Sequence, residues 1–212
     1  MKRWVFLDFD GVIIDSEGIS LRSWRSLFAG EKELSLADIC GNSAVENARR
    51  LFPELVDNQD IENIVSEKVS RDHAQLEGGR YPLVSQATET VINLSGQYDL
   101  AIVSSNSSST VNDHLAHYDL SDYIRRVVCA NDELRRKPAP DLYFEALGAC
   151  ETRREDAVAI EDSPAGIAAA NAAGVAVIGF GQAVEHSPIQ TGWLSSFDDQ
   201  RRVAGSLKQA FN

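Results

Sequence analysis

The pattern of hydrophobic and polar positions changes character near residue 80 of the chain. Before that point, one continuous apolar run covers residues 4–7 and ends at an aspartate, as is typical of a strand buried on both faces. From residue 16 to residue 80 the apolar positions follow helical spacing without a strand-like interruption. This block predicts helices over residues 16–29, 44–52 and 60–75. In the last of them we expect the buried stripe to run from Ile61 to Val69.

After residue 80, short apolar runs alternate with segments of helical spacing. The runs predict strands over residues 100–103, 126–129, 157–160 and 175–180, and the segments predict helices over residues 84–95, 108–117, 139–148, 164–172 and 199–210. Such alternation is typical of a parallel sheet with crossover helices, and thus of a doubly wound, Rossmann-like α/β fold. The helical block interrupts this order after the first strand. We therefore predict an inserted α-helical cap domain over residues 16–80, with residues 1–15 and 81–212 forming the α/β core.

Composition and charge restrict the classes of function. The 212 residues are 43% hydrophobic, as in globular proteins, and 20 basic against 32 acidic residues give a net charge of −12. This charge argues against nucleic-acid and anionic membrane partners. An odd number of widely spaced cysteines indicates free thiols in a reducing compartment, and no apolar run is long enough for a signal peptide or a membrane span. We therefore expect a soluble, cytoplasmic protein. As a separate expectation, it is a monomer or dimer. His114 and His117 have no acidic partner motif, and we interpret them as a surface pair.

Polar residues that could take part in catalysis or ligand binding follow several of the predicted strands. The first strand is followed by Asp8, Asp10 and Gly11, and two later strands and a loop contribute Ser104, Ser105, Asn106, Lys137, Glu161 and Asp162. Ligands of open α/β sheets bind outside the carboxyl ends of the strands. We therefore expect these side chains to converge at one edge of the sheet although they lie far apart in the sequence.

The acidic members of this set predict a cation site. Asp8, Asp10 and Asp162, with Glu161 beside them, place three or four carboxylates together, and such a cluster repels itself unless a hard cation neutralises it. Oxygen ligands without histidine or cysteine favour Mg²⁺. The sequence therefore predicts Mg²⁺ as the cofactor.

The remaining members predict a site for phosphate. Lys137 supplies a positive charge, and Ser104 precedes backbone N–H groups at the start of a helix, where anions bind. With Mg²⁺ and a phosphate monoester present, the site keeps an excess of negative charge, so one carboxyl group is easily protonated. A neutral Asp10 would donate a proton to a leaving oxygen, and Asp8 would act as the nucleophile.

Four segments of the chain resemble the motifs of the haloacid dehalogenase-like hydrolase superfamily, in the branch that contains phosphatases and β-phosphoglucomutase. The segments are residues 8–16, 103–104, 137–141 and 161–174, and the resemblance extends over about residues 4–180. It implies that Asp8 is the nucleophile and a Mg²⁺ ligand, and that Asp10 is the acid and base and binds Mg²⁺ through its carbonyl oxygen. Asp162 would complete the metal site, with Glu161 beside it.

The resemblance also assigns the residues that contact the substrate. It implies that Ser104 and Lys137 hold the phosphoryl group, and from their positions in the sequence we expect Gly11, Ser105 and Asn106 around it. The helical insert resembles a small cap that closes over the substrate, and Ser16 and Asn42 lie at positions that face the substrate in relatives. We therefore expect a Mg²⁺-dependent phosphomonoester hydrolase that forms an aspartyl-phosphate on a small phosphorylated metabolite, such as a sugar phosphate or a phosphoglycolate-like compound.

Three alternatives remain open. A β-phosphoglucomutase-like enzyme shares the motifs, but those relatives carry a histidine where this chain has Ser20 and an arginine where it has Ala44. A phospho-receiver signalling domain uses a similar acidic cluster, but it comprises only about 120 residues and lacks a cap. A dehalogenase needs neither the second aspartate of the first motif nor Mg²⁺.

Overall fold

The structure is a computed structural model, and it describes residues 3–28, 33–39, 44–55, 57–76, 78–131, 133–187 and 191–211. The chain forms two compact units. One comprises Asp15–Pro82, and the other comprises Met1–Ile14 together with Leu83–Asn212.

The larger unit contains a six-stranded parallel sheet. Its strands are β1 (Trp4–Leu7), β2 (Asp99–Ser104), β3 (Arg126–Cys129), β4 (Ala157–Glu161), β5 (Ala176–Phe180) and β6 (Gly192–Leu194). The strand order is β3-β2-β1-β4-β5-β6, so β1 lies between β2 and β4. In this register Leu7 pairs with Ile102 on one side and with Ile160 on the other. The predicted doubly wound α/β fold is confirmed.

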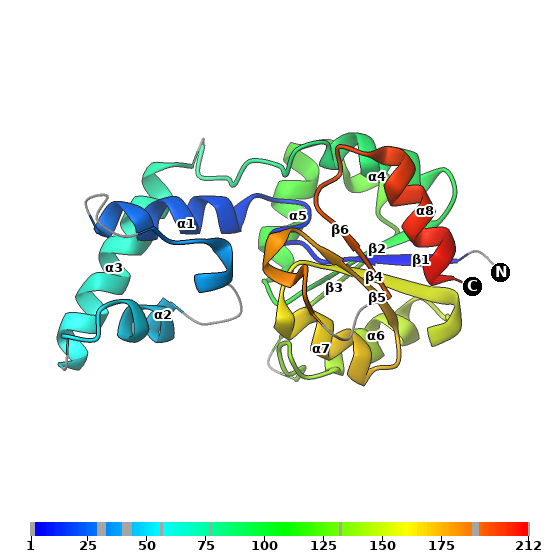
Figure 1. Cartoon of the computed structure of the whole chain (residues 1–212). Coiled ribbons are helices and arrows are strands. Elements are labelled where there is room, and N and C mark those ends of the chain that lie inside the picture. Colours follow the sequence, from blue (N-terminus) through cyan, green and yellow to red (C-terminus); the bar gives the residue numbers. More distant parts are fainter. Residues whose placement is uncertain are drawn as a thin grey trace. The chain divides into compact units, whose positions relative to one another are not determined.

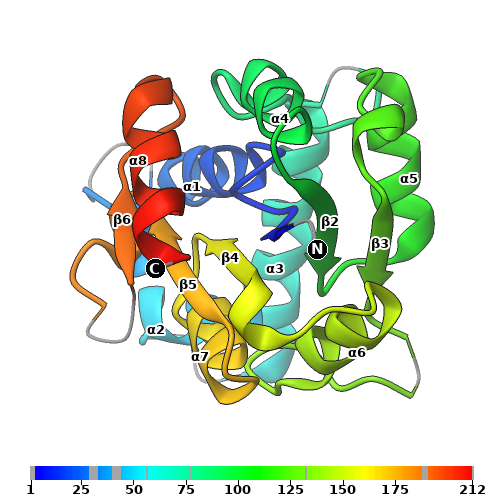
Figure 2. The ribbon, with the colours of Figure 1, turned by 90° about the vertical axis from the view of Figure 1, so that its right-hand side faces the viewer.

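Helices cover both faces of this sheet (Figures 1 and 2). One face carries α4 (Ala87–Ser95), α5 (Ser108–His117) and α8 (Gln200–Ala210), and the other carries α6 (Asp141–Ala149) and α7 (Pro164–Ala172). Under α6 and α7 a buried core includes Phe6, Val103, Tyr143 and Ile167. The inner side of α7 consists mainly of small residues, and Gly166 near its start lies against the Glu161 carboxylate at the end of β4.

The smaller unit is helical. It contains α1 (Ser16–Leu27), α2 (Ala44–Leu51) and α3 (Asn58–Ala74) around a core that includes Trp24. Phe28 and Phe52 stack with ring centroids 4.4 Å apart. Ile61 is buried, as the stripe on α3 predicts, but Val69 is 40% exposed, so the stripe ends before that residue.

Several element boundaries differ from the sequence prediction for local reasons. The helix expected from residue 84 begins at Ala87, because Gln86 adopts a left-handed conformation with φ of 60°. The helix expected from residue 139 begins at Asp141, because Pro140 disfavours helical geometry at the residue before it. Strand β6 was not predicted, since three residues at the sheet edge carry too short a pattern. Short 3₁₀ helices occur at Leu36–Asp38, Ser121–Tyr123, Arg154–Asp156 and Gln182–Val184.

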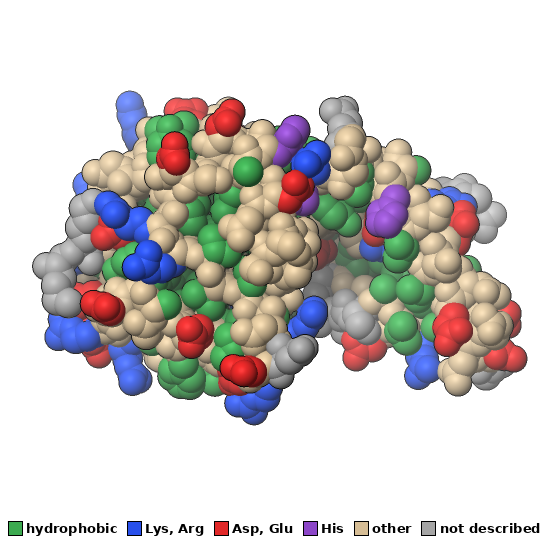
Figure 3. Space-filling view, turned by 180° about the vertical axis from the view of Figure 1, so that it is seen from behind, with side chains coloured by type: hydrophobic (Ala, Val, Ile, Leu, Met, Phe, Trp, Pro, Cys, Tyr) green, Lys and Arg blue, Asp and Glu red, His purple; other side chains and the backbone are tan. Residues whose placement is uncertain are grey.

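The surface shows no single dominant charge on the side drawn in Figure 3. Acidic and basic side chains are interspersed over this side of the α/β unit. Among the residues that the structure describes, no helix has the length and apolar content needed to cross a membrane.

Candidate active site

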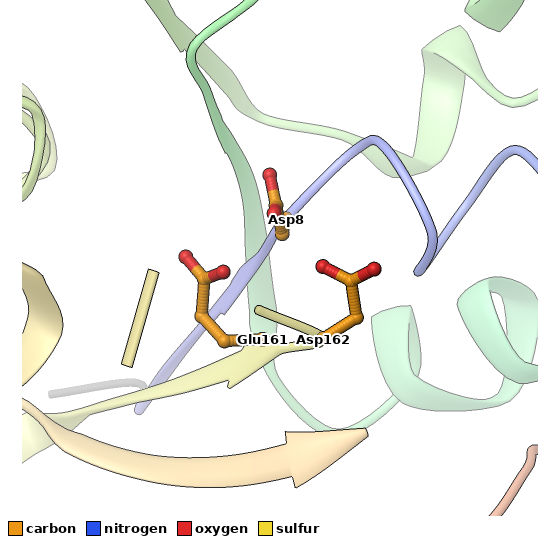
Figure 4. A group of neighbouring side chains, drawn as sticks. All are labelled: Asp8, Glu161 and Asp162. Atoms are coloured by element: carbon orange, nitrogen blue, oxygen red, sulfur yellow. The ribbon is translucent and has the colours of Figure 1, made fainter. Parts of the chain in front are cut away.

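Three buried carboxylates meet at the carboxyl ends of the two central strands. Because Leu7 pairs with Ile160, Asp8 follows β1 directly beside the end of β4, where Glu161 and Asp162 lie. One carboxylate oxygen from each of the three residues lies within 4.8 Å of the others. Asp8 stands between the other two side chains, and all three carboxyl groups point to the same side (Figure 4).

Asp8 is held firmly through one of its oxygens. Its Oδ1 accepts a hydrogen bond from the backbone N–H of Phe9 at 2.7 Å and lies 2.9 Å from Lys137 Nζ. Its backbone N–H donates to the carbonyl oxygen of Ile160 at 3.0 Å, which continues the strand pairing. Within the described ranges no protein donor reaches Oδ2. That oxygen therefore keeps its lone pairs for a metal ion or an electrophile.

Lys137 is the cation of the site. Its side chain is only 5% exposed, and Nζ lies 2.7 Å from Glu161 Oε1 and donates to the carbonyl oxygen of Val103 at 2.7 Å. Burial alone would lower the pKa of Lys137, but the charges of Asp8 and Glu161 outweigh it and raise that pKa above its ordinary value. The ammonium group therefore stays charged at any physiological pH.

Glu161 forms a second ion pair with Lys137 and is fully buried. Its Oε1 accepts hydrogen bonds from Lys137 and from the hydroxyl of Tyr143, whereas its Oε2 is buried without a partner among the described residues. Burial, followed by the charge of Asp8, raises the pKa of Glu161 above its ordinary value, whereas Lys137 and the hydroxyl of Tyr143 lower it. A methyl group at Gly166 would come within 1.7 Å of Oε2, so only glycine leaves room for this carboxylate.

Three loops bring the predicted phosphate residues together. Ser104 is fully buried at the end of β2, and its Oγ accepts from the backbone N–H of Asn106 at 3.0 Å. The amide of Asn106 donates to Asp10 Oδ2 at 3.5 Å, and the backbone N–H of Lys137 donates to Ser105 Oγ at 3.4 Å. The chain leaves Asp10 through a turn at Gly11, whose φ is 72° and favours glycine. These contacts bring residues from the first, second and third motifs to one place.

The two predicted residues of the helical unit are not part of this group of contacts. Ser16 is the first residue of α1, and its Oγ is buried without a hydrogen-bond partner in the described part of the chain. Asn42 lies outside the described residues. Contact of either residue with a substrate stays a prediction.

Sequence reasoning missed two neighbours of the site and misplaced a third. Tyr143 and Gly166 lie on helices whose pattern indicates only packing, although a buried tyrosine hydroxyl usually needs a partner. The interpretation of His114 as a surface residue is wrong, because it is 5% exposed and lies edge-on to Phe9 at 5.7 Å between ring centroids.

The three carboxylates fit a hard divalent cation. All donors that Asp8, Glu161 and Asp162 offer are oxygens, and one oxygen of each lies within 4.8 Å of the other two. Mg²⁺ prefers such oxygen ligands, and a cluster of like charges is stabilised when it binds.

Comparison with known proteins decides the family. Residues 5–180 match the family model described as haloacid dehalogenase-like hydrolase. The chain belongs to the haloacid dehalogenase-like hydrolase family. This membership accounts for the order in which the site residues occur along the chain, and it confirms the predicted family and enzyme class.

Relatives of this hydrolase include named phosphatases. The bifunctional riboflavin kinase/FMN phosphatase of Arabidopsis thaliana is 27% identical over 94% of this chain, which spans only 52% of that protein. The fructose-1-phosphate phosphatase of Escherichia coli strain K12 is 26% identical over 81% of this chain and 92% of that protein. A solved structure of a conserved haloacid dehalogenase-like protein of unknown function from Agrobacterium tumefaciens C58 shares the fold, with a TM-score of 0.75 and 20% identity over 98% of this chain and 100% of that chain.

Proposed function

We propose that this hydrolase cleaves phosphomonoesters of a small phosphorylated metabolite, with Mg²⁺ as cofactor and an aspartyl-phosphate at Asp8 as intermediate. The observation that carries the proposal is the buried pair of Asp8 and Lys137, with Asp8 Oδ2 free of protein donors in the part of the chain described. A carboxylate whose second oxygen is fixed by a lysine is well prepared for nucleophilic attack. The relatives named for FMN and fructose 1-phosphate support a small phosphorylated substrate such as a sugar phosphate, and a phosphoglycolate-like compound is part of the same proposal.

The proposed reaction has two steps. In the first, an oxygen of Asp8 attacks phosphorus, the bond from phosphorus to the leaving oxygen breaks, and the carboxylic acid of Asp10 gives its proton to that oxygen. In the second, the Asp10 carboxylate takes a proton from water while the water oxygen attacks phosphorus. Asp8 is released as a carboxylate, together with inorganic phosphate.

The remaining residues of the site bind and neutralise the phosphoryl group. Lys137 and Ser104, with Ser105, Asn106 and the turn at Gly11, would surround its oxygens. Asp8, Asp162 and the carbonyl oxygen of Asp10 would hold Mg²⁺, with Glu161 beside them. When bound, Mg²⁺ supplies positive charge that offsets the charge of the carboxylates and the phosphate.

The proposed function includes a role for the helical unit and a cellular location. We assign residues 16–80 as the cap that covers the substrate, with Ser16 and Asn42 as contacts, and residues 1–15 and 81–212 as the catalytic core. Cys129 and Cys150 are free thiols, which is consistent with a cytoplasmic enzyme.

Phosphate release from a panel of phosphomonoesters tests this proposal. The panel contains FMN, fructose 1-phosphate, other sugar phosphates, phosphoglycolate and p-nitrophenyl phosphate. We expect release with Mg²⁺, its abolition by a chelator, restoration by added Mg²⁺, and poor replacement by Ca²⁺, whose coordination is looser and higher in number. Full activity in the presence of chelator would contradict the proposal.

The mutase alternative needs a separate measurement. Ser20 on α1 and Ala44 at the start of α2 replace the histidine and arginine of the mutase relatives, and Arg49 and Arg50 bond to Asn58 and Asn47 within the helical unit. We supply β-glucose 1-phosphate with catalytic glucose 1,6-bisphosphate and expect inorganic phosphate as the main product. Glucose 6-phosphate formed faster than inorganic phosphate would favour the mutase.

A further inference from the structure

Tyr143 on α6 touches both members of the ion pair between Lys137 and Glu161. It is fully buried, and its hydroxyl donates to Glu161 Oε1, the same oxygen that accepts from Lys137. Its ring centroid lies 5.6 Å from Lys137 Nζ, within the range of a cation–π contact. One side chain therefore contacts the cation and its counter-ion at the same time.

The carboxylate of Glu161 is confined from two sides. The hydroxyl of Tyr143 fixes Oε1, and Oε2 lies so close to Gly166 on α7 that no side chain fits there. One oxygen of the carboxylate is thus held by the hydroxyl of Tyr143, and the other occupies the space beside Gly166 that a side chain would fill.

We propose that Tyr143 is a positioning residue that acts through Glu161 to hold the Lys137 ammonium group against Asp8. In this arrangement Glu161 forms an ion pair with Lys137 and is not a ligand of the cation that the aspartates bind. This inference rests on the proposed function, because the position of Lys137 matters only if Asp8 and a phosphoryl group react there.

Lys137 needs such positioning because a lysine side chain is flexible. A four-carbon stem has many rotamers, and the ammonium group has a defined direction only when several acceptors fix it. Lys137 has three N–H donors, and Asp8, Glu161 and the carbonyl oxygen of Val103 lie around them at 2.9, 2.7 and 2.7 Å. If Glu161 turns away, the ammonium group loses one of these three fixed points.

The variant Tyr143→Phe tests the proposal, because it removes the hydroxyl and keeps the ring. With p-nitrophenyl phosphate as substrate, we expect kcat/KM to fall about tenfold, as for the loss of a hydrogen bond to a charged group. The competitive inhibition constant of inorganic phosphate should rise in parallel. The Mg²⁺ concentration for half-maximal activity should stay within about twofold of wild type, because Glu161 does not serve the cation.

The matched control is Tyr98→Phe. Tyr98 stacks on Phe211 with ring centroids 5.5 Å apart and precedes β2, at the opposite end of that strand from Ser104. This variant should keep all three constants of the wild type. A merely structural role of Tyr143 would lower the melting temperature and the amount of active enzyme, but it would leave the phosphate inhibition constant of the remaining enzyme unchanged.

Two results would overturn the inference. One is a Tyr143→Phe enzyme with wild-type kcat/KM and phosphate inhibition. The other is a Mg²⁺ requirement that rises as much as the phosphate inhibition constant, since Glu161 would then be a ligand of the metal.

If Tyr143→Phe does not fold, Glu161→Gln replaces it with the same expected pattern and the same contradicting results. A wild-type enzyme that releases no phosphate with Mg²⁺ contradicts the proposed function, whereas an active wild type with an unchanged variant contradicts only this inference.

Discussion

Asp8 and Asp10 stand two residues apart in environments that suit different tasks. Asp8 is 6% exposed, and its Oδ1 lies 2.9 Å from Lys137 Nζ. Asp10 is half-buried, and its Oδ2 accepts from the amide of Asn106 at a distance of 3.5 Å. Two carboxyl groups in such different surroundings are a common basis for separating the nucleophile from the acid.

The variant Asp10→Asn should separate the two steps of the reaction. An amide can neither protonate the leaving oxygen nor activate water, so we expect turnover to fall by about 10²- to 10⁴-fold. If the second step is the slower one, the phosphorylated enzyme should accumulate and be detected by mass spectrometry after acid quenching. The exposed Asp122→Asn serves as control and should behave as wild type. Turnover of Asp10→Asn close to wild type would remove Asp10 from the mechanism.

At the residue scale, the sequence predicted which polar residues converge at the ends of the strands but not all the neighbours that contact them. Asp8, Lys137 and Asp162 could be predicted because a strand followed by acid, or a lysine before a proline-rich turn, is a local pattern. Tyr143 could not be assigned, because its spacing on α6 is that of an ordinary core residue. Its contact with Glu161, 18 positions away, is formed only because α6 packs against the strand end that carries Glu161.

The start of α7 is the element on which the acidic site depends most. Ser163 caps the helix by accepting from the backbone N–H of Gly166 at 3.0 Å, and Pro164 stands at the first helical position. This geometry places Glu161 and Asp162 immediately before the helix. Gly166 then lies directly against the carboxylate of Glu161.

The variant Gly166→Ala should therefore separate stability from activity. Alanine favours helix by up to about 1 kcal/mol over glycine, but its methyl group would displace the Glu161 carboxylate from Lys137. We expect a loss of activity of about tenfold or more that the melting temperature does not explain. In Gly205→Ala on α8, where no atom lies within 4 Å of the added methyl group, stability should rise with unchanged activity. Equal activity in both variants would contradict a role for the Glu161 position.

At the element scale, the periodicity predicted the long elements and missed the short or irregular ones. The five apolar runs that form β1 to β5 have four or more residues, whereas β6 has three and lies at the edge beside β5. Helix α4 begins later than predicted because Gln86 adopts a positive φ, which no sequence pattern indicates for glutamine. Hydrophobic spacing therefore does not predict helix boundaries that are set by the backbone conformation of a single residue.

At the scale of the whole molecule, one inserted segment separates the first motif from the others. The switch from strand to helical periodicity and back indicated that insert, and the structure forms a compact helical unit over Asp15–Pro82. The convergence of four distant motifs could be predicted because all of them follow parallel strands or precede their helices. The substrate could not be predicted, because the helical unit offers a buried Ser16 and scattered arginines rather than a distinctive pattern.

The most direct test of the mechanism compares wild type with Asp8→Asn. Inorganic phosphate released from p-nitrophenyl phosphate is measured with saturating Mg²⁺, and the melting temperature confirms that both proteins are folded. Since the covalent route needs a carboxylate at position 8, we predict that Asp8→Asn loses at least ~10³-fold in turnover while it remains folded. Comparable turnover in the two proteins would contradict Asp8 as the nucleophile and with it the proposed mechanism.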